Sequence, residues 1–198
     1  MIRAVIFDFG YVLCTFDPAR LSHMIAQSTG DSAEDISAIL MEHQDWFDQF
    51  EEGRMQPFEM YKRITRQFIL EWTFAEFYRH YSQRFSPIDE NVSLLHRLAD
   101  AGYLLGMLTN TSETDFHGQI NGFGFIRLFD HVTRSYEVGA LKPDPLIYRH
   151  SLIGLGVRAD EAVFIDDLER NVLAFERLGG RGIVYRGNGQ NLASELAI

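Results

Sequence analysis

The chain has 198 residues, 46% of them hydrophobic, and a net charge of -10 at pH 7. This composition supplies enough apolar surface for a sizeable core and disfavours disorder. The net charge is negative and the sequence has no basic run, so we expect no binding to nucleic acid or to anionic membranes. No stretch approaches the roughly 20 apolar residues of a membrane span, and we therefore expect a cytoplasmic protein.

A dense apolar run, Arg3 to Gly10 (RAVIFDFG), opens the chain. Val, Ile and Phe at this density indicate a strand buried on both faces, which is typical of parallel sheets. Open parallel sheets bind their ligands outside the carboxyl ends of such strands. Asp8 is therefore predicted to place a carboxylate in a crevice, while the lone Cys14 is expected to be a buried core residue that forms no disulfide.

The next part of the chain, residues 17–85, shows only helical periodicity. A strand-helix-strand unit needs about 30 residues, and the interval from Asp8 to Thr109 is far longer. Connections inside compact α/β units are usually short. We therefore expect residues 17–85 to form a helical domain inserted after the first strand, overhanging the crevice, and residues 1–16 and 86–198 to form one α/β domain.

Strands and helices alternate in the rest of the chain. The expected strands are Tyr103 to Thr109, Asp130 to Ser135, Ala162 to Asp166 and Arg181 to Tyr185. The expected helices are Asp89 to Ala101, Asp144 to Leu155, Leu168 to Leu178 and a short last one from Leu192. This alternation predicts right-handed crossovers and a parallel sheet that helices cover on both faces.

Polar side chains follow the strand that ends at Thr109, in the run Thr109-Asn110-Thr111-Ser112. The Thr109 hydroxyl and the backbone N–H groups after it could bind a phosphate, aided by the positive end of the following helix. Hydroxyl residues also cap helices for structural reasons alone, so the run by itself supports both interpretations.

Lys142 stands immediately before Pro143, Asp144 and Pro145, and the last two of these are typical of a helix start. A residue before proline is held in an extended conformation, so the Lys142 ammonium would be aimed in one direction. An exposed lysine is usually only a solvated charge, and for Lys142 alone both interpretations stay open.

Two adjacent carboxylates, Asp166 and Asp167, end the third of these strands, and Asn171 follows one helical turn after Asp167. Neighbouring carboxylates without a cation are unfavourable. Magnesium binds one or two carboxylates together with water and substrate oxygens, which suits a site shared by Asp8 and Asp167. The alternative is a capping aspartate beside a solvated one.

Taken in order, Asp8, Thr109, Lys142 and the pair Asp166-Asp167 resemble the four motifs of the haloacid dehalogenase (HAD) superfamily. The resemblance covers essentially the whole chain, and the segment Phe50 to Arg54 (FEEGR) is similar to a recurrent sequence of the family's helical cap. It implies a doubly wound, parallel Rossmann-like sheet with an inserted all-helical cap, of the C1 type found in subfamily I.

The resemblance also implies a magnesium-dependent phosphatase that hydrolyses a small organic phosphomonoester through an aspartyl phosphate on Asp8. In such a site Lys142 would lower the pKa of Asp8, and the expected partner is the small phosphate ester, with the protein a monomer or a homodimer. The implied catalytic residues are Asp8, Thr109 and Lys142; the metal ligands are Asp8, the Gly10 carbonyl and Asp167; the phosphate-binding residues are Thr109, Asn110 and Lys142; and Asp166 and Asn171 orient the metal ligands or a water.

One position departs from the usual pattern. Typical phosphatases of the superfamily carry a second aspartate, the general acid and base, two residues after the nucleophile, and this chain has Gly10 there. Loss of such a group typically slows a reaction about 10²- to 10⁴-fold. A D-x-G first motif also occurs in the sugar-1-phosphatase-like branch, so a sugar phosphate is one expected substrate. Tyr11, Asp17 or a water could supply the proton, and the sequence does not choose among them.

Two other functions stay open. A haloacid dehalogenase of the same fold also lacks the second aspartate, but a metal-free site gives no reason for the pair Asp166-Asp167. The other alternative is a phosphate-binding sensor or interaction protein, in which Gly10 has erased turnover. Substrate specificity is expected to depend on the cap, where the candidate residues are Phe16, Asp17, Trp46, Phe47 and Arg54.

Overall fold

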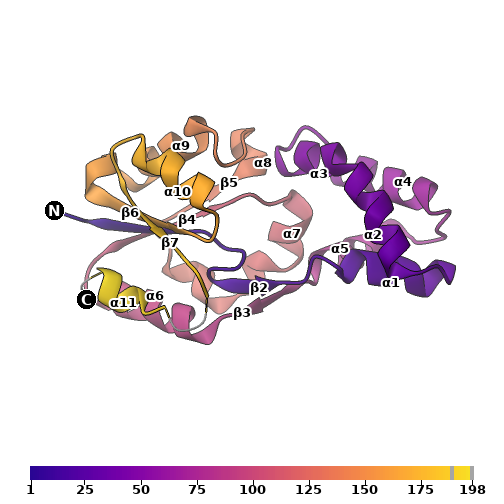
Figure 1. Ribbon diagram of the computed structural model, residues 1–198, viewed down its shortest axis with the longest axis horizontal. Coiled ribbons are helices and arrows are strands. Elements are labelled where there is room, and N and C mark those ends of the chain that lie inside the picture. Colours follow the sequence, from indigo (N-terminus) through magenta and orange to yellow (C-terminus); the bar gives the residue numbers. More distant parts are fainter. Residues whose placement is uncertain (188–189, 197–198) are drawn as a thin grey trace.

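The computed structural model describes residues 1–187 and 190–196 (Figure 1). The strands in this part of the chain are β1 Ala4–Phe7, β2 Cys14–Phe16, β3 Phe85–Pro87, β4 Leu104–Thr109, β5 His131–Arg134, β6 Ala162–Asp166 and β7 Arg181–Val184. The α-helices are α1 Arg20–Thr29, α2 Ala33–Glu42, α3 Gln44–Glu51, α4 Pro57–Gln67, α5 Phe74–Ser82, α6 Asp89–Asp100, α7 Glu113–Gly118, α8 Ser135–Val138, α9 Pro145–Leu155, α10 Glu169–Glu176 and α11 Leu192–Leu196. Short 3-10 helices lie at Ile120–Gly122, Gly124–Leu128 and Ala159–Glu161. Within the described residues, none of the helices combines the length and the apolar character required to cross a membrane.

Five strands form one parallel sheet in the order β5-β4-β1-β6-β7. The central strand is β1, whose Ile6 pairs with Gly106 of β4 on one side and Phe164 of β6 on the other. Figure 1 shows α9 and α10 on one side of the sheet and α6 and α11 on the other. The predicted α/β fold, with a parallel sheet between helical layers, is therefore confirmed.

The residues of β1 explain its central place. Ala4 and Ile6 pack in a buried cluster with residues of α9 and α10, whereas Val5 and Phe7 pack in the cluster on the opposite face with residues of α6. Successive strand residues point to opposite faces, so a strand covered on both sides has to be apolar throughout. The apolar run before Asp8 meets this requirement and carries the aspartate to the edge of the sheet.

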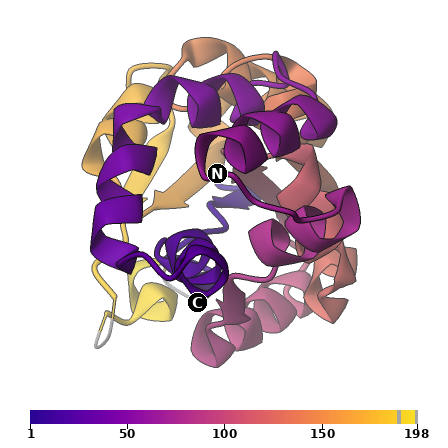
Figure 2. The ribbon, with the colours of Figure 1, turned by 90° about the vertical axis from the view of Figure 1, so that its right-hand side faces the viewer.

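Helices α1 to α5 lie beyond the carboxyl ends of the strands, and we refer to them as the cap. They enclose a hydrophobic cluster of their own, which includes the fully buried Ile25, Met60, Ile64, Phe77 and Tyr81. The antiparallel pair of β2 and β3 connects the cap to the sheet. Figure 2, viewed from the cap side, shows the cap helices in front of the strand ends. The cap therefore overhangs the edge at which Asp8 lies.

The sequence periodicity does not predict α3 or the pair of β2 and β3. Helix α3 follows α2 directly, with His43 ending one helix and preceding the other, so the helical period continues across the junction. Strands β2 and β3 have three residues each, too few to show the alternation that marks a strand. Other expected boundaries differ by one or two residues, as at α10, which ends at Glu176 instead of Leu178.

The approach of the cap to the sheet domain gives a stability prediction. Gly53, just after α3, has a φ of +71°, and a Cβ there would overlap the carbonyl oxygen of Tyr136 in α8. Gly53→Ala is expected to lower the free energy of unfolding by about 1–2 kcal/mol for the left-handed conformation and by roughly 1–3 kcal/mol more for the overlap. Urea unfolding followed by circular dichroism measures the loss.

Gly30→Ala is the matched control for Gly53→Ala. Gly30 has a φ of +83°, but no atom lies within 4 Å of a Cβ added there. This variant should therefore show only the conformational part of the loss. Equal losses in the two variants would contradict the close approach of Gly53 to Tyr136.

Candidate active site

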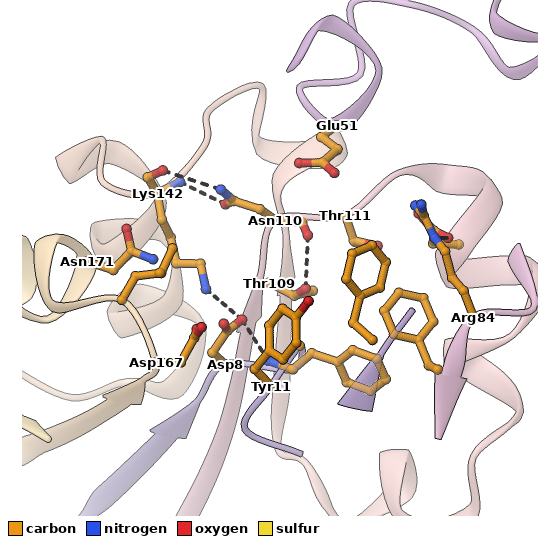
Figure 3. Close-up of a pocket in the computed structure, with 16 residues that line it drawn as sticks. Asp8, Tyr11, Glu51, Arg84, Thr109, Asn110, Thr111, Lys142, Asp167 and Asn171 are labelled. Atoms are coloured by element: carbon orange, nitrogen blue, oxygen red, sulfur yellow. Dashed lines mark hydrogen bonds and ion pairs between the residues drawn. The ribbon is translucent and has the colours of Figure 1, made fainter. Parts of the chain in front are cut away.

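The predicted functional residues lie at the carboxyl ends of three adjacent strands. Asp8 follows β1, Thr109 ends β4 and Asp166 ends β6, and β1 lies between β4 and β6. Lys142 comes from the loop between α8 and α9. Because parallel strands end at the same edge of a sheet, Asp8, Thr109, Lys142 and Asp167 meet around one cavity of about 310 Å³ (Figure 3).

Lys142 links two of the carboxylates. Its Nζ lies 2.6 Å from Asp8 Oδ1 and 2.7 Å from Asp166 Oδ2, and only 5% of the residue is exposed. The interpretation of Lys142 as a solvated charge is therefore wrong. Burial disfavours the ammonium, but the attraction of Asp8 and Asp166 outweighs burial and raises the pKa of Lys142.

The carboxyl of Asp8 is shifted in the direction opposite to the expected one. Burial raises the pKa of Asp8 to about 7, although the charge of Lys142 lowers it. The Lys142 contact thus acts as predicted, but withdrawal from water dominates. Asp8 Oδ1 also accepts a hydrogen bond from Phe9 N at 2.7 Å, whereas Oδ2 has no hydrogen-bond partner among the residues that the structure describes. Oδ2 is therefore the oxygen open to a ligand or a reacting group.

Asp166 is completely buried and held from several sides. Asn171 Nδ2 donates to Asp166 Oδ1 at 2.9 Å and to Oδ2 at 3.1 Å, and Leu168 N donates to Oδ1 at 2.8 Å. Asn171 is fixed in turn by the hydroxyl of Tyr148, which donates to its carbonyl oxygen at 3.0 Å. Asp166 and Asn171 thus form a rigid support under Lys142.

Asp8, Asp166 and Asp167 form an acidic cluster. Each offers one carboxylate oxygen, and the three oxygens lie within 4.8 Å of one another. Lys142 pairs with Asp8 and Asp166, while Asp167 forms no ion pair within residues 1–187 and 190–196. Oxygen ligands of this kind suit a hard divalent cation, and Gly10 lines the same cavity beside them. The residues present therefore fit a metal ion such as Mg²⁺.

Thr109, Asn110 and the residues after them form another wall of the cavity. The Asn110 side chain is occupied by Lys142: its Oδ1 accepts from Lys142 N at 2.8 Å and its Nδ2 donates to Lys142 O at 3.3 Å. The Thr109 hydroxyl makes one long bond, of 3.3 Å, to Asn110 O. Ser112 accepts from Asp115 N at 3.1 Å and caps α7. The interpretation as a structural cap holds for Ser112, whereas the Thr109 hydroxyl is available to a ligand.

Ser135, the first residue of α8, joins this wall to the cap. Its hydroxyl oxygen accepts from Thr111 N at 2.9 Å and lies 2.6 Å from the carbonyl oxygen of Glu51 and 3.0 Å from that of Thr111. Ser135 is fully buried. The end of α3, where Glu51 lies, is thereby fastened to the loop that follows Thr109.

Glu51 reaches the cavity from the cap, on the side opposite Asp8 (Figure 3). Its carboxyl makes no hydrogen bond or ion pair with any residue that the structure describes, and withdrawal from water raises its pKa to about 7. The sequence singles out the segment Phe50 to Arg54 as cap-like, but not Glu51 as a cavity residue. Its placement depends on the packing of α3, which the sequence does not reveal.

Arg84 is a second cavity residue that the sequence does not indicate. Its Nε lies 3.0 Å from Asp115 Oδ1 and its Nη2 lies 2.7 Å from Oδ2, in a nearly buried ion pair. The guanidinium also packs 4.3 Å from the ring centre of Tyr81 and 4.8 Å from that of Phe16. Arg84 thus closes one side of the cavity, held by the Asp115 carboxylate and packed against the rings of Tyr81 and Phe16.

A second cavity, of about 470 Å³, lies within the cap next to the first one. The two cavities share Phe16, Glu51 and Arg84, and the second is also lined by apolar side chains of α1, α2 and α3. Of the residues expected to set specificity, Phe16 lines both cavities and Phe47 lines the second. Asp17, Trp46 and Arg54 line neither of the two.

The model of the haloacid dehalogenase-like hydrolase family matches residues 2–179. The chain belongs to this family of hydrolases, which confirms the resemblance based on its four motifs.

Individual relatives extend over nearly the whole chain. The sesquiterpene phosphatase astK of Aspergillus oryzae is 31% identical over 182 residues, which are 91% of this chain and 88% of the relative. A HAD family enzyme of Bacteroides thetaiotaomicron has 22% identity and a TM-score of 0.85, with 98% of both chains covered. The wild-type form of that enzyme in complex with magnesium and inorganic phosphate has 20% identity and a TM-score of 0.81, over 98% of this chain and 99% of the other. The fold of the sheet and cap is therefore shared with HAD enzymes.

The Ser135 contacts give a prediction about stability. Ser135→Ala removes the partner of the Thr111 N–H and of the Glu51 carbonyl in a buried position, which is expected to lower the free energy of unfolding by about 1–3 kcal/mol. Ser151→Ala is the control, because Ser151 is also fully buried but its Oγ has no hydrogen-bond partner among the described residues. Urea unfolding should show no loss, or a gain, for Ser151→Ala. Equal losses in the two variants would contradict the role of Ser135 in joining cap and loop.

Proposed function

We propose that this protein is a magnesium-dependent phosphatase that hydrolyses a small organic phosphomonoester through an aspartyl phosphate on Asp8. The observation that carries the proposal is the buried ammonium of Lys142 between Asp8 and Asp166, beside Asp167 and Thr109 in one cavity. Membership of the HAD-like hydrolase family and the similarity to a sesquiterpene phosphatase support a phosphate ester as the substrate.

Asp8 Oδ2 is the nucleophile in this proposal. Phe9 N and Lys142 hold Oδ1, so Oδ2 is presented to the cavity in a fixed direction. Attack on phosphorus forms the Asp8 Oδ2–P bond as the ester P–O bond breaks, and a water then releases inorganic phosphate and restores the carboxylate. Two displacements of this kind replace one difficult displacement.

The phosphoryl group would be held by the residues around Asp8. Lys142 and the Thr109 hydroxyl donate to its oxygens, where charge develops during the displacement. Asn110 contributes by fixing the main chain of Lys142 through two hydrogen bonds. The phosphate-binding group is therefore rigid before the substrate arrives.

Asp8, Asp167 and the carbonyl of Gly10 are the proposed magnesium ligands, which Asp166 and Asn171 keep in place. When bound, Mg²⁺ supplies the positive charge that allows an anionic nucleophile and an anionic ester to approach each other. The excess of carboxylates over ammonium groups supports a cation here, as does the magnesium of the Bacteroides complex. The same excess disfavours the alternative of a metal-free dehalogenase.

The second cavity supports an ester with an apolar leaving group. Leu21, Leu40, Met41 and Phe47 line it, and it opens beside the phosphate cavity at Phe16. Apolar surface buried there would stabilise the complex by about 25 cal/mol per Å². The similarity to a sesquiterpene phosphatase supports the same substrate class. We therefore place phosphates of apolar alcohols beside sugar phosphates as the substrates to test.

We further propose that residues 17–85 are the cap domain that closes over the leaving group and that residues 1–16 and 86–198 are the domain that transfers the phosphoryl group. The separate hydrophobic cluster of α1 to α5 supports this division. The pair of β2 and β3 would then lie at the boundary between the two domains.

Phosphate release from a panel of esters tests the proposed function. The panel contains sugar 1-phosphates, aryl phosphates and phosphates of isoprenoid alcohols, each assayed with Mg²⁺ and with EDTA. Wild-type protein is expected to release phosphate only with Mg²⁺. Asp8→Asn should lower the rate by about 10⁴-fold or more, because a carboxamide is a poor nucleophile.

Asp160→Asn is the matched control, because Asp160 is an exposed carboxylate that pairs with Arg158 and does not line the cavity. Its activity should equal that of the wild type, and Asp167→Asn should need more Mg²⁺ for half-maximal activity. Phosphate binding by folded wild-type protein without release from any ester would contradict the proposal and favour the sensor alternative.

A further inference from the structure

The proposed reaction lacks an evident proton donor. Gly10 stands where related phosphatases carry an aspartate, and a Cβ added at Gly10 would meet no atom within 4 Å, so that part of the cavity is open. An alkoxide leaving group needs a proton as the P–O bond breaks, and the water that hydrolyses the aspartyl phosphate has to lose one. A positioned acid and base typically accelerates such steps about 10²- to 10⁴-fold.

Glu51 is placed to meet this need. It lines the same cavity as Asp8 and Lys142 but enters from the cap, where the leaving group would lie (Figure 3). It also lines the second, more apolar cavity, so Glu51 lies where the two cavities adjoin. No hydrogen bond or ion pair to another described residue occupies that carboxyl, which leaves both oxygens available to a substrate.

The main chain of Glu51 is held firmly although its side chain is free. Its carbonyl oxygen accepts from Ser135 Oγ at 2.6 Å, and Ser135 in turn accepts from Thr111 N at 2.9 Å. The end of α3 is therefore fixed relative to the loop that begins at Thr109. A proton donor has to be positioned in this way to act on a bond at phosphorus.

The surroundings of Glu51 also suit proton transfer near neutral pH. Glu51 is partly buried, and this withdrawal from water raises its pKa to about 7. The ionisable groups that face it from the neighbouring elements are Arg84 and Lys142, which lower its pKa, Asp115 and Asp48, which raise it, and the hydroxyl of Tyr81. Asp115 is paired with Arg84, so these two charges largely offset each other.

The two side chains that the sequence suggests as donors are less suitable. Tyr11 lines the cavity, but partial burial and the charges of Asp167 and Asp17 raise its pKa further above the ordinary value for a phenol. Asp17 is exposed, its Oδ1 accepts from Ala19 N at 3.0 Å, and it does not line the cavity. Neither offers an unoccupied carboxyl inside the cavity.

We propose that Glu51 is the general acid and base of this enzyme, in place of the aspartate missing at position 10; the inference rests on the proposed phosphatase function. In the first step Asp8 Oδ2 attacks phosphorus, the ester P–O bond breaks and the leaving oxygen takes the proton of the Glu51 carboxyl. In the second step the Glu51 carboxylate takes a proton from water as the water oxygen attacks phosphorus. The Asp8–P bond then breaks, its electron pair returns to the Asp8 carboxylate and inorganic phosphate leaves.

A pair of similar esters tests this role. The nitrophenolate of 4-nitrophenyl phosphate can leave without a proton, whereas the alkoxide of 4-nitrobenzyl phosphate cannot. Glu51→Gln should lower kcat/KM for 4-nitrobenzyl phosphate by about 10²- to 10⁴-fold. With 4-nitrophenyl phosphate the same variant should release a burst of nitrophenolate, stoichiometric with enzyme and close to the wild-type rate, followed by slow turnover. The burst is expected because only the hydrolysis of the aspartyl phosphate then lacks its base.

The pH profile provides a second readout. For wild-type protein kcat/KM with 4-nitrobenzyl phosphate should fall about tenfold per pH unit above about pH 7, because the protonated form of Glu51 is the acid. Glu51→Asp keeps a carboxyl and should keep this limb at a reduced rate, whereas Glu51→Gln should lose it. Glu52→Gln is the matched control, since Glu52 is the next residue, pairs with Arg54 and does not line the cavity; it should behave as wild type.

The possible failures are distinguishable. If the wild-type protein hydrolyses both esters and Glu51→Gln changes kcat/KM for each by less than about threefold, the role of Glu51 is overturned. The phosphatase function then still stands. Loss of the nitrophenolate burst in folded Glu51→Gln, in proportion to the loss with the benzyl ester, would also overturn it, since a purely structural role affects both esters alike. Absence of phosphate release by the wild-type protein would overturn the proposed function and this inference with it.

Discussion

The site depends on one contact, the buried ammonium of Lys142 between Asp8 and Asp166. A buried charge is tolerated only when it is paired and hydrogen-bonded. Both carboxylates follow from neighbouring parallel strands, so the register of β1 on β6 fixes the gap that the ammonium fills. Asn110 holds the main chain of Lys142 and Asn171 holds Asp166. Removal of Lys142 would leave two buried carboxylates without their counter-charge, and the sheet, the loop and α10 are therefore coupled electrostatically.

The same contact leaves the cavity with an excess of negative charge. Lys142 is one ammonium among the three carboxylates of the acidic cluster. Burial of the site raises the pKa of Asp8, and the charge of Asp166 adds to this rise. A phosphate ester would add further negative charge, so the proposed nucleophilic attack and phosphate binding both require a cation to offset this charge. On another side of the cavity, Glu51 of the cap and Arg84, which follows α5, add two more ionisable groups.

The sheet domain could be predicted from the sequence because its signals are local. β1 and β6 are continuous apolar runs, and Asp8 and Asp166 follow or end them, so the strands themselves place the carboxylates. The burial of Lys142 could not be predicted, since it depends on two carboxylates distant in the sequence. The position of Glu51 could not be predicted either, because it depends on how α3 packs within the cap. The helical period continues through His43, so the sequence does not show where α3 begins.

Trapping the phosphoryl group on the protein distinguishes attack by Asp8 from direct attack by water. Protein mixed with Mg²⁺ and an ester that it hydrolyses is quenched with acid at successive times and digested, and its peptides are analysed by mass spectrometry. If Asp8 is the nucleophile, we expect a phosphorylated peptide in which Asp8 carries the phosphoryl group, formed and consumed at rates that match phosphate release. Phosphate release with Asp8 unmodified at every quench time would exclude an aspartyl phosphate, because water would then attack the ester directly.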